Sequence, residues 1–336
     1  MRYLVTGGQG FVGRYVIAEL LRNDRSCEIY AVGRSPRLDS FTHSVSWNGV
    51  RVPAPIPDEL QRSSERVNYL AADLADADAV ERVVDAAMPD VVLHMASALR
   101  GDSPESLLRT NVLGTQQLLH ALCRRRRQLS MFVNGSSGSV YGNTTAGPAS
   151  PGKEASPPDF YAVSKLAQEH VAGIAGADFG LPITHARIFN IVGPGQDERH
   201  VCGRFAGTVA AIARGIIPAV IEVGNLDATR DFIDVRDVAL GILAIASYGR
   251  PSDTYNVASS IETSVAFVLT ELLKAAGLLH KVAIVRKDIA RSSLTRQVAD
   301  IAALRAIGFK PRFEIARSLA DVLAYYTDRV RPVALA

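Results

Sequence analysis

Three residues, Ser137, Tyr161 and Lys165, have the types and spacing for proton transfer to a carbonyl oxygen. Tyr161 and Lys165 stand four positions apart, so a helix would place both side chains on one face. A lysine ammonium beside a phenol favours the phenolate and lowers the tyrosine pKa from about 10 toward neutral pH. Such a tyrosine can exchange a proton with a substrate oxygen while a hydride moves. Ser137 could hydrogen-bond the same oxygen, so we predict that these three residues form a catalytic centre.

A glycine-rich turn near the start of the chain predicts a dinucleotide site. Its glycines have GxxGxxG spacing and lie between an apolar run, residues 2–6, and a helical pattern, residues 11–22. Glycine allows a tight turn in which backbone amides approach a pyrophosphate, and the helix N-terminus favours the negative charge. Three such glycines alone would fit a purely structural turn, but the strand–turn–helix context favours binding. The residues expected at the cofactor here are Gly7, Gly10, Phe11, Val12 and Gly13.

Other cofactor residues are expected where later strands end. Asp73 and Leu74 follow the third strand and could meet an adenine ring, although Asp73 could instead cap the next helix, as could Asp76. The fourth strand ends at a carboxyl edge, where open sheets bind ligands. We therefore place Met95 and Ala96 at the cofactor. Two serines near these strand ends are predicted to bind substrate, Ser97 and Ser139.

The residue after the second strand predicts which dinucleotide is bound. Enzymes that prefer NAD usually place an acid there, where it binds the ribose 2′-hydroxyl and repels a 2′-phosphate. In this chain the strand, residues 28–32, ends without an acid and is followed by Arg34 and Ser35. Arg34 could bind a 2′-phosphate, with help from Arg14 or Arg37, or it could be a solvated loop cation. We predict NADPH as the preferred cofactor, with NAD possible.

Strands and helices alternate through the first half of the chain, which predicts a parallel, doubly wound Rossmann sheet. A smaller α/β lobe for substrate would follow, because the elements become short and irregular after residue 189. We assign residues 1–189 and 226–260 to the dinucleotide domain, 190–225 and 261–328 to the substrate lobe, and 329–336 to a tail. The expected strands are 2–6, 28–32, 67–71, 90–96, 131–134 and 183–189, and the expected helices are 11–22, 77–88, 107–122 and 161–175. Residues 36–66 read as an insertion with a hairpin around Trp47-Asn48-Gly49.

Composition narrows the classes of protein. The net charge of +3 over 336 residues gives no argument for nucleic acid, and the basic run Arg124 to Arg127 fits a helix C-terminus better than a polyanion patch. Three distant cysteines and seven unclustered histidines predict neither disulfides nor a metal site, in keeping with a reducing cytoplasm. No apolar run approaches the ~20 residues that span a membrane, and the first residues do not read as a signal peptide.

Taken together, these motifs resemble the extended short-chain dehydrogenase/reductase superfamily, in its nucleotide-sugar-modifying branch. The resemblance covers nearly the whole chain, and segments 187–196 and 230–238 look most like GDP-4-keto-6-deoxy-D-mannose reductases. It implies that Asn111 supports the active site close to the cofactor. It also implies that Asn190 and Arg230 bind the sugar nucleotide, with Arg291 as a second diphosphate clamp. Related enzymes commonly pair two helices per subunit, so the resemblance implies a homodimer through 107–122 and the Tyr161 helix, unless those faces are covered within the monomer.

One departure from related dehydratases narrows the reaction. Those enzymes place an acid, often an Asp-Glu pair, directly after the catalytic hydroxyl, because eliminating water needs an acid and a base. Here the positions hold Gly138 and Ser139, which cannot do this work near neutral pH. The sequence therefore predicts an NAD(P)H-dependent reductase of an NDP-4-keto-6-deoxyhexose. The alternatives are a 4-epimerase with tightly bound NAD and, more remotely, a non-catalytic dinucleotide sensor.

Overall fold

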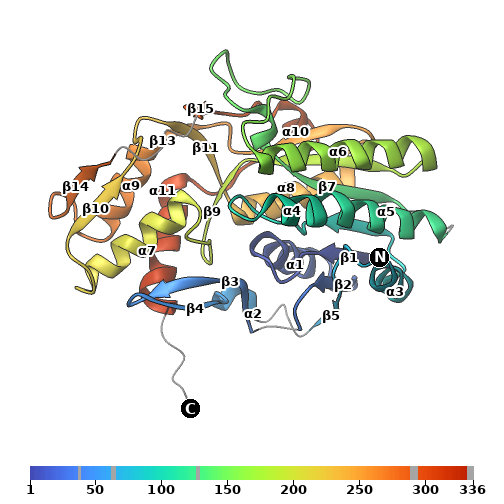
Figure 1. Ribbon diagram of the computed structural model, residues 1–336, viewed down its shortest axis with the longest axis horizontal. Helices are drawn as coiled ribbons and strands as arrows, with labels where there is room; N and C mark the ends of the chain where they lie inside the picture. Colours follow the sequence, from blue (N-terminus) through green and yellow to red (C-terminus); the bar gives the residue numbers. More distant parts are fainter. Residues whose placement is uncertain (37–38, 62–65, 126–128, 288–293, 331–336) are drawn as a thin grey trace.

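The computed structural model describes residues 1–36, 39–61, 66–125, 129–287 and 294–330 (Figure 1). Its main feature is a seven-stranded parallel sheet with the order β12-β8-β7-β6-β1-β2-β5. Chain order reverses between β1 and β6, the point at which open α/β sheets bind ligands. The predicted Rossmann fold is therefore confirmed. The strands are β1 (Arg2–Thr6), β2 (Glu28–Gly33), β5 (Val67–Ala71), β6 (Val91–His94), β7 (Met131–Ser137), β8 (Ile183–Ile188) and β12 (Thr254–Val257).

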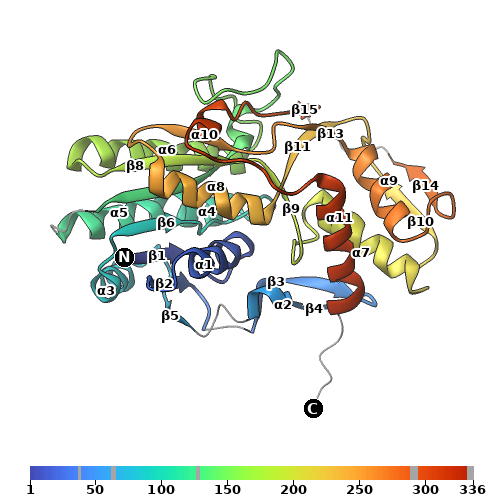
Figure 2. The ribbon, with the colours of Figure 1, turned by 180° about the vertical axis from the view of Figure 1, so that it is seen from behind.

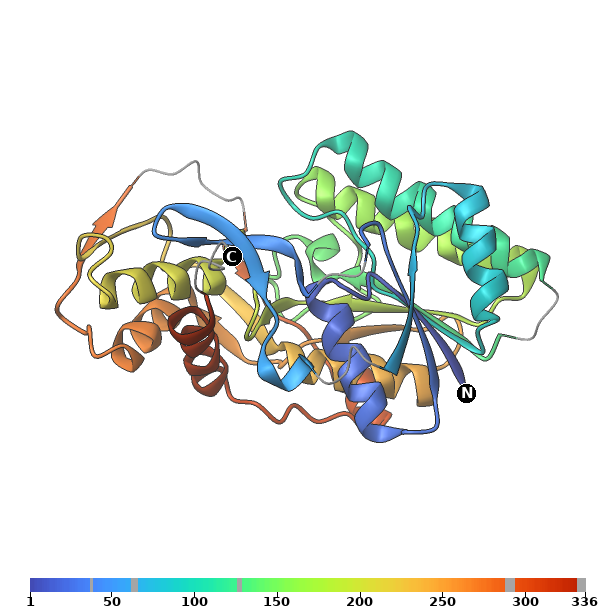
Figure 3. The ribbon, with the colours of Figure 1, turned by 90° about the horizontal axis from the view of Figure 1, so that it is seen from below.

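Helices cover both faces of this sheet (Figure 3). On one face α1 (Phe11–Asn23) packs beside α8 (Val235–Tyr248), and on the other α3 (Ala77–Ala87), α5 (Gly114–Arg124) and α6 (Phe160–Phe179) lie in a row. Burial on two faces explains why the central strands are nearly continuous apolar runs, as in β6, where all four residues are buried. The element types predicted from residues 1–189 are thus observed, with most boundaries shifted by a few residues.

The prediction of one continuous helix over residues 107–122 is wrong in detail. The structure has a short α4 (Pro104–Leu107), a π-helical segment η2 (Leu108–Leu113) and then α5. At its centre Asn111 is fully buried, and its side-chain Oδ1 accepts a hydrogen bond from the backbone N–H of Ala98 at 2.8 Å. A π-turn adds a residue to the helix and often accompanies a functional site. In this chain it directs a buried amide toward the neighbouring loop.

The basic run at the end of α5 faces acids of α3. Arg124 donates to Glu81 at 2.6 Å and Arg125 donates to Asp85 at 2.7 Å. Arg126 and Arg127 lie outside the described residues. Arg124 and Arg125 therefore form ion pairs at the end of a helix. This favours the interpretation of the basic run as a helix C-terminus over a polyanion patch.

Beyond β8 the chain builds a smaller lobe beside the sheet (Figure 2). A four-stranded sheet combines β9 (Asn190–Val192), β11 (Thr229–Asp234), β13 (Glu262–Ser264) and β15 (Arg296–Gln297), and a separate pair joins β10 (Val220–Val223) to β14 (Ala283–Arg286). The larger helices of this region are α7 (Val201–Ala213), α9 (Val265–Ala275) and α11 (Ile315–Ala324). Strand β11 belongs to the smaller sheet, whereas the sequence analysis assigned residues 226–260 to the dinucleotide domain. The boundaries between the two domains therefore stay a prediction.

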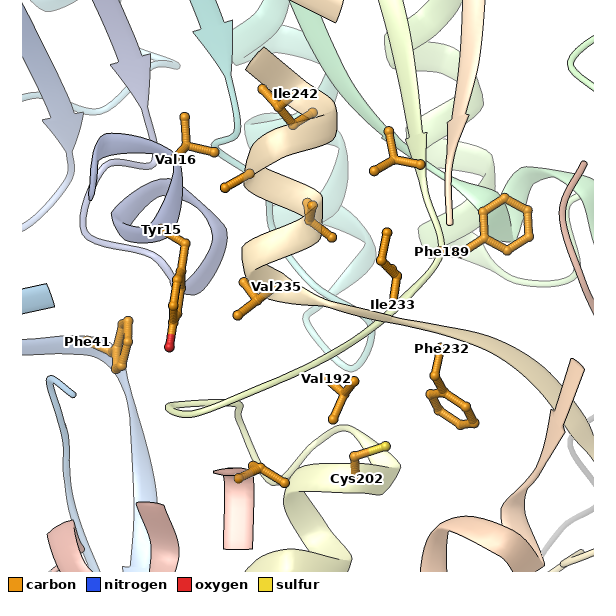
Figure 4. Packing of buried hydrophobic residues seen from close by; sticks show 14 of the residues in the cluster. Tyr15, Val16, Phe41, Phe189, Val192, Cys202, Phe232, Ile233, Val235 and Ile242 are labelled. Atoms are coloured by element: carbon orange, nitrogen blue, oxygen red, sulfur yellow. The ribbon is translucent and has the colours of Figure 1, made fainter. Parts of the chain in front are cut away.

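One hydrophobic cluster joins the large sheet to the lobe (Figure 4). Tyr15 and Val16 of α1 meet Val235 and Ile242 of α8, and the cluster continues into Ile233 of β11. These side chains are at most 3% exposed. Since apolar burial is the main favourable term in folding, this continuous core fixes the lobe against the sheet edge where the site lies.

The insertion at 36–66 contains the predicted hairpin, formed by β3 (Ser40–Trp47) and β4 (Val50–Pro55). Trp47 pairs with Val50, so Asn48 and Gly49 form a two-residue turn with φ of 49° and 78°, as a type I′ turn requires. The hairpin reaches the lobe, where Glu198 accepts from the backbone N–H of Ser46 at 2.8 Å. The insertion thus links the dinucleotide half to the lobe.

Among the described helices, none is long and apolar enough to cross a membrane.

Candidate active site

A cavity of about 400 Å³ lies at the carboxyl edge of the sheet, between the sheet and the lobe. It brings together most residues that the sequence analysis selected from distant segments. Those that line it are Gly7, Gly10, Phe11, Val12, Gly13, Arg34, Asp73, Leu74, Met95, Ala96, Ser97, Ser137, Ser139, Tyr161, Lys165 and Asn190. Asn111 and Arg230 do not line the cavity, and Arg291 lies outside the described residues.

The glycine loop fits a dinucleotide diphosphate. A Cβ atom at Gly13 would lie 2.2 Å from the backbone oxygen of Gly7, and one at Gly7 would lie 2.8 Å from the backbone nitrogen of Ala96. Gly7 also has a φ of +68°, which L side chains rarely adopt. Helix α1 begins after Gly10 with no acidic residue in its first turn. Its amide groups and dipole are therefore available to an anion, as pyrophosphate binding requires.

Arg34 and Asp73, the residues expected at the adenosine of the cofactor, both line the cavity. Arg34 is exposed and has no hydrogen-bond or ion-pair partner among the residues that the structure describes. The buried Arg14, suggested as its helper, instead donates to the backbone oxygen of Ser40 at 2.8 Å. Asp76 caps α3 by accepting from Ala79, which leaves Asp73 in the cavity wall. Arg37, the other suggested helper, lies outside the described residues.

His94, at the end of β6, is structural. Its ring nitrogens lie 2.7 Å from the hydroxyl of Thr6 and 2.8 Å from that of Thr115. The side chain is fully buried, and burial lowers its pKa to about 3. A neutral imidazole with both ring nitrogens hydrogen-bonded holds β1, β6 and α5 together, and His94 does not line the cavity.

The catalytic candidates meet because α6 begins beside the end of β7. Asp159 caps this helix by accepting from the backbone N–H of Ala162 at 2.9 Å, and Tyr161 stands in the first turn. Ser137 is the last residue of β7. Lys165, one turn after Tyr161, is 2% exposed and donates to the backbone oxygen of Gly135 at 2.6 Å. The predicted Ser–Tyr–Lys arrangement therefore shares one wall of the cavity.

Burial has the largest influence on the pKa values of this centre. Burial raises the pKa of Tyr161, and the hydroxyl of Ser137, the charge of Arg100 and the hydroxyl of Ser97 oppose it. Lys165 is not among the leading influences. Burial lowers its own pKa to about 7, so its ammonium is only partly present at neutral pH. Desolvation therefore has the largest influence on the pKa of both groups, and the tuning of Tyr161 by Lys165 stays a prediction.

Asn111 lies behind the cavity wall and does not face the cofactor position. Its Oδ1 accepts from the hydroxyl of Ser97 at 3.1 Å, and its Nδ2 donates to the hydroxyl of Ser164 at 3.0 Å. It thus connects the loop after β6 to α6. These contacts fit the supporting role that the resemblance implied, and its assignment as a cofactor residue stays a prediction.

Of the predicted substrate residues, Asn190 lines the cavity and Arg230 does not. Asn190 lines the cavity, and its Nδ2 donates to the backbone oxygen of Asp231 at 3.2 Å. Arg230 points its guanidinium at backbone oxygens, with Leu294 accepting at 2.8 Å. Among the described contacts Arg230 forms no ion pair with Asp231, which accepts from the backbone N–H and the hydroxyl of Ser259. Arg230 therefore stands near the site without reaching into the cavity.

Several cavity residues escaped the sequence analysis. They come from the hairpin, from the loop after β6, from the segment before α7 and from β15, and include His43, Arg100, Arg199, His200 and Gln297. Arg100 could have been noticed three residues after the selected Ser97. The others carry no local signal, because tertiary folding alone brings them to the cavity.

The geometry defines a class of protein, a Rossmann enzyme of the short-chain dehydrogenase/reductase type with a nicotinamide dinucleotide as cofactor. The model of the NAD-dependent epimerase/dehydratase family matches residues 3–258. The chain belongs to this family, as the resemblance implied.

Individual relatives cover several activities within the family. GDP-6-deoxy-D-mannose reductase of Pseudomonas aeruginosa is 34% identical over 260 residues, which are 73% of this chain and 82% of the relative. The solved structure of RMD from Pseudomonas aeruginosa complexed with NADPH is similar with a TM-score of 0.78 and 30% identity, covering 98% of this chain and 100% of the other. UDP-glucose 4-epimerase of Thermus thermophilus, solved with NAD, has a TM-score of 0.80 and 25% identity at the same coverages.

Proposed function

We propose that the chain is a reductase of an NDP-4-keto-6-deoxyhexose that uses NADPH. The observation that carries the proposal is the Ser137–Tyr161–Lys165 centre in a dinucleotide cavity whose tyrosine holds its proton. A raised pKa keeps Tyr161 protonated at neutral pH, which suits a proton donor. The similarity to a GDP-6-deoxy-D-mannose reductase supports the same direction of reaction.

In the proposed mechanism the glycine loop and Arg34 would hold a reduced nicotinamide dinucleotide, which would supply the hydride that C4 of the sugar needs. Ser137 orients the C4 oxygen by hydrogen bonding, and Tyr161 donates its proton to that oxygen. Lys165, one helical turn away and held by Gly135, positions the backbone at the end of β7. The product is an alcohol, and the tyrosine regains a proton from solvent.

Dehydration is disfavoured by space as well as by chemistry. A Cβ atom at Gly138 would lie 2.6 Å from the ring of Phe189, so an acid at this position would need the ring to move. Ser139, the next residue, is 7% exposed and supplies only a hydroxyl. The chain therefore lacks the acid–base pair after Ser137 that eliminating water needs.

The second candidate is a 4-epimerase, which the similarity to UDP-glucose 4-epimerase supports. An epimerase must first take a proton from the substrate, so it needs Tyr161 as a base. The third candidate is a non-catalytic dinucleotide sensor. Such a protein has no need of Ser137, Tyr161 and Lys165 together in the cavity wall, so their presence argues against it.

The function can be tested by offering purified enzyme GDP- and dTDP-linked 4-keto-6-deoxyhexoses together with NADPH. We expect loss of NADPH absorbance in proportion to the alcohol formed, with one nucleotide preferred. Turnover of a 4-hydroxy sugar nucleotide without added coenzyme would instead establish the epimerase.

We also propose a homodimer through the helices η2–α5 and α6. Leu118, Leu119 and Leu122, which lie in the helix predicted over 107–122, are buried within the monomer, so they cannot form this interface. Other apolar side chains of the same helices are exposed, among them Leu113 at 37% and Ile174 at 61%. An exposed apolar face of this kind fits an isologous contact between two copies.

Light scattering at micromolar concentration should give twice the 36.0 kDa mass of the chain. Ile174→Glu should shift the mass toward the monomer, because it buries a charge in the proposed interface. Ile217→Glu, at an exposed apolar side chain of the lobe, is the control and should leave the mass unchanged. A monomer mass for the unaltered protein would contradict the dimer.

A further inference from the structure

His200 is a cavity residue whose side chain is not engaged by any residue that the structure describes. It lies directly before α7, and its ring does not cap that helix. The residue lines the cavity and is exposed. Within the described ranges its imidazole takes part in no hydrogen bond and no ion pair. Both ring nitrogens are therefore free to bind a molecule that enters the cavity.

Other polar side chains that the lobe contributes to the cavity have partners within the protein. Asp197 forms an ion pair with Arg199 at 2.7 Å, and Arg199 also reaches Asp102 at 3.2 Å. Three amide side chains of this wall donate to backbone oxygens, those of Asn190, Gln196 and Gln297. His200 differs from these residues because its polar atoms are not already used to hold the lobe together.

The backbone that carries His200 is fixed from several sides. The hydroxyls of Tyr15 in α1 and Tyr326 after α11 donate to backbone oxygens of residues 194 and 196, at 2.9 and 2.7 Å. Glu198 accepts from the backbone N–H of Ser46 in the hairpin at 2.8 Å. A binding residue on a segment held in this way needs little reorganisation when its ligand arrives.

His200 belongs to the part of the lobe wall that meets the catalytic half of the cavity. Its neighbour Arg199 contacts Asp102, which lies in the loop after β6. Arg100 of the same loop lies over the Tyr161 ring, with its guanidinium carbon 5.4 Å from the ring centre. A sugar held by its C4 oxygen at Tyr161 therefore has its remaining groups directed toward this wall.

The groups that such a sugar offers are hydroxyls. In an NDP-4-keto-6-deoxyhexose, C1 bears the diphosphate, C4 is the ketone and C6 has no hydroxyl, so free hydroxyls remain at C2 and C3. A hydroxyl both donates and accepts hydrogen bonds, and a neutral imidazole has one nitrogen of each kind. A guanidinium can only donate and a carboxylate can only accept. Of these groups, an unengaged imidazole is best matched to a hydroxyl.

We propose that His200 is the residue through which the lobe recognises the C2 and C3 hydroxyls of the hexose. The inference deepens the proposed function and rests on it, because it assumes a sugar whose C4 oxygen meets Ser137 and Tyr161. His200 contacts the substrate away from the reacting atoms, so it selects the sugar and transfers no proton. A sugar that lacks the contacted hydroxyl should therefore bind less well.

The inference can be tested by binding alone, with calorimetry on protein saturated with NADP⁺. The probes are the NDP-6-deoxyhexose that the proposed reaction would form and its 2-deoxy and 3-deoxy analogues. The unaltered protein should bind one analogue about tenfold more weakly than the parent sugar. His200→Ala should lose about tenfold in affinity for the parent and should no longer distinguish it from that analogue, because the two changes remove the same contact.

Two further variants separate recognition from a structural effect. His200→Gln keeps a donor and an acceptor, so it should retain part of the discrimination between parent and analogue. His280→Asn is the matched control, because His280 is exposed and has a φ of 65°, which asparagine tolerates. It should bind all three sugars as the unaltered protein does. The affinity for NADP⁺ should be the same in every variant, whereas a disturbed lobe would weaken all three sugars equally.

The possible failures are distinguishable. If the unaltered protein binds the parent sugar but His200→Ala binds it equally well, His200 does not recognise the substrate and the proposed function stands. An equal loss for the parent and both analogues in His200→Ala would also overturn the inference, because it would show a general effect on the lobe. If the unaltered protein binds none of the three sugars with any nucleotide, the proposed function fails and the inference fails with it.

Discussion

Replacing Tyr161 with phenylalanine is expected to lower turnover by at least ~10²-fold, because the change removes the proposed proton donor and keeps the ring. The phenol stands in the first turn of α6, in the same cavity wall as Ser137. Without it, the oxyanion that forms at C4 would have to take its proton from water. NADPH affinity should stay nearly unchanged, since the glycine loop and Arg34 are untouched.

The comparison needs two measurements and one control. kcat is measured with the keto sugar, and NADPH binding is measured by the change in its fluorescence. Tyr248→Phe removes a hydroxyl from a side chain that is 70% exposed, so it should behave as the unaltered enzyme. Near-normal turnover of Tyr161→Phe would remove Tyr161 from the mechanism.

The second large effect concerns the choice of cofactor. Arg34 lines the adenosine end of the cavity, is exposed and has no partner within the described part of the chain. A charge-assisted contact with a 2′-phosphate contributes ~1.5–3 kcal/mol, or about a ten- to hundredfold preference for NADPH. Arg34→Ala should remove most of this preference by raising KM for NADPH, with little effect on NADH.

The control for this prediction is Arg22→Ala, which removes an exposed arginine at the other end of α1. It tests whether loss of any positive charge weakens NADPH binding. Steady-state kcat/KM values with NADPH and with NADH show whether Arg34 selects the cofactor. If the unaltered enzyme uses NADH as well as NADPH, Arg34 does not select the cofactor and the epimerase with bound NAD becomes the better proposal.

Local sequence patterns predicted the parts of the molecule that local chemistry determines. The apolar run of β6 follows from burial on both faces, and Asn48-Gly49 follows from the positive φ that a type I′ turn needs. The glycines of the first turn could be recognised from their spacing, and the structure gives the reason for it, because a Cβ atom at Gly13 would collide with the backbone of Gly7. The spacing of Tyr161 and Lys165 needed only a helix.

Properties that depend on tertiary structure could not be predicted in the same way. The pKa of Lys165 depends on the depth at which α6 is buried, and this depth has no signature in the spacing. Asn111 turns away from the cavity because a π-turn redirects it toward Ala98. Arg100 and His43 reach the cavity from a loop and an inserted hairpin, so only the fold, which brings these segments together, places them there.

The central claim, hydride delivery to C4 with net consumption of the coenzyme, is tested most directly with NADPH that carries deuterium at both C4 positions of the nicotinamide. The enzyme is incubated with the preferred NDP-4-keto-6-deoxyhexose, and the product is examined by NMR and mass spectrometry. The account predicts one deuterium at C4 of the sugar for each NADPH oxidised. Formation of a 4-epimer without deuterium and without net oxidation of NADPH would contradict it.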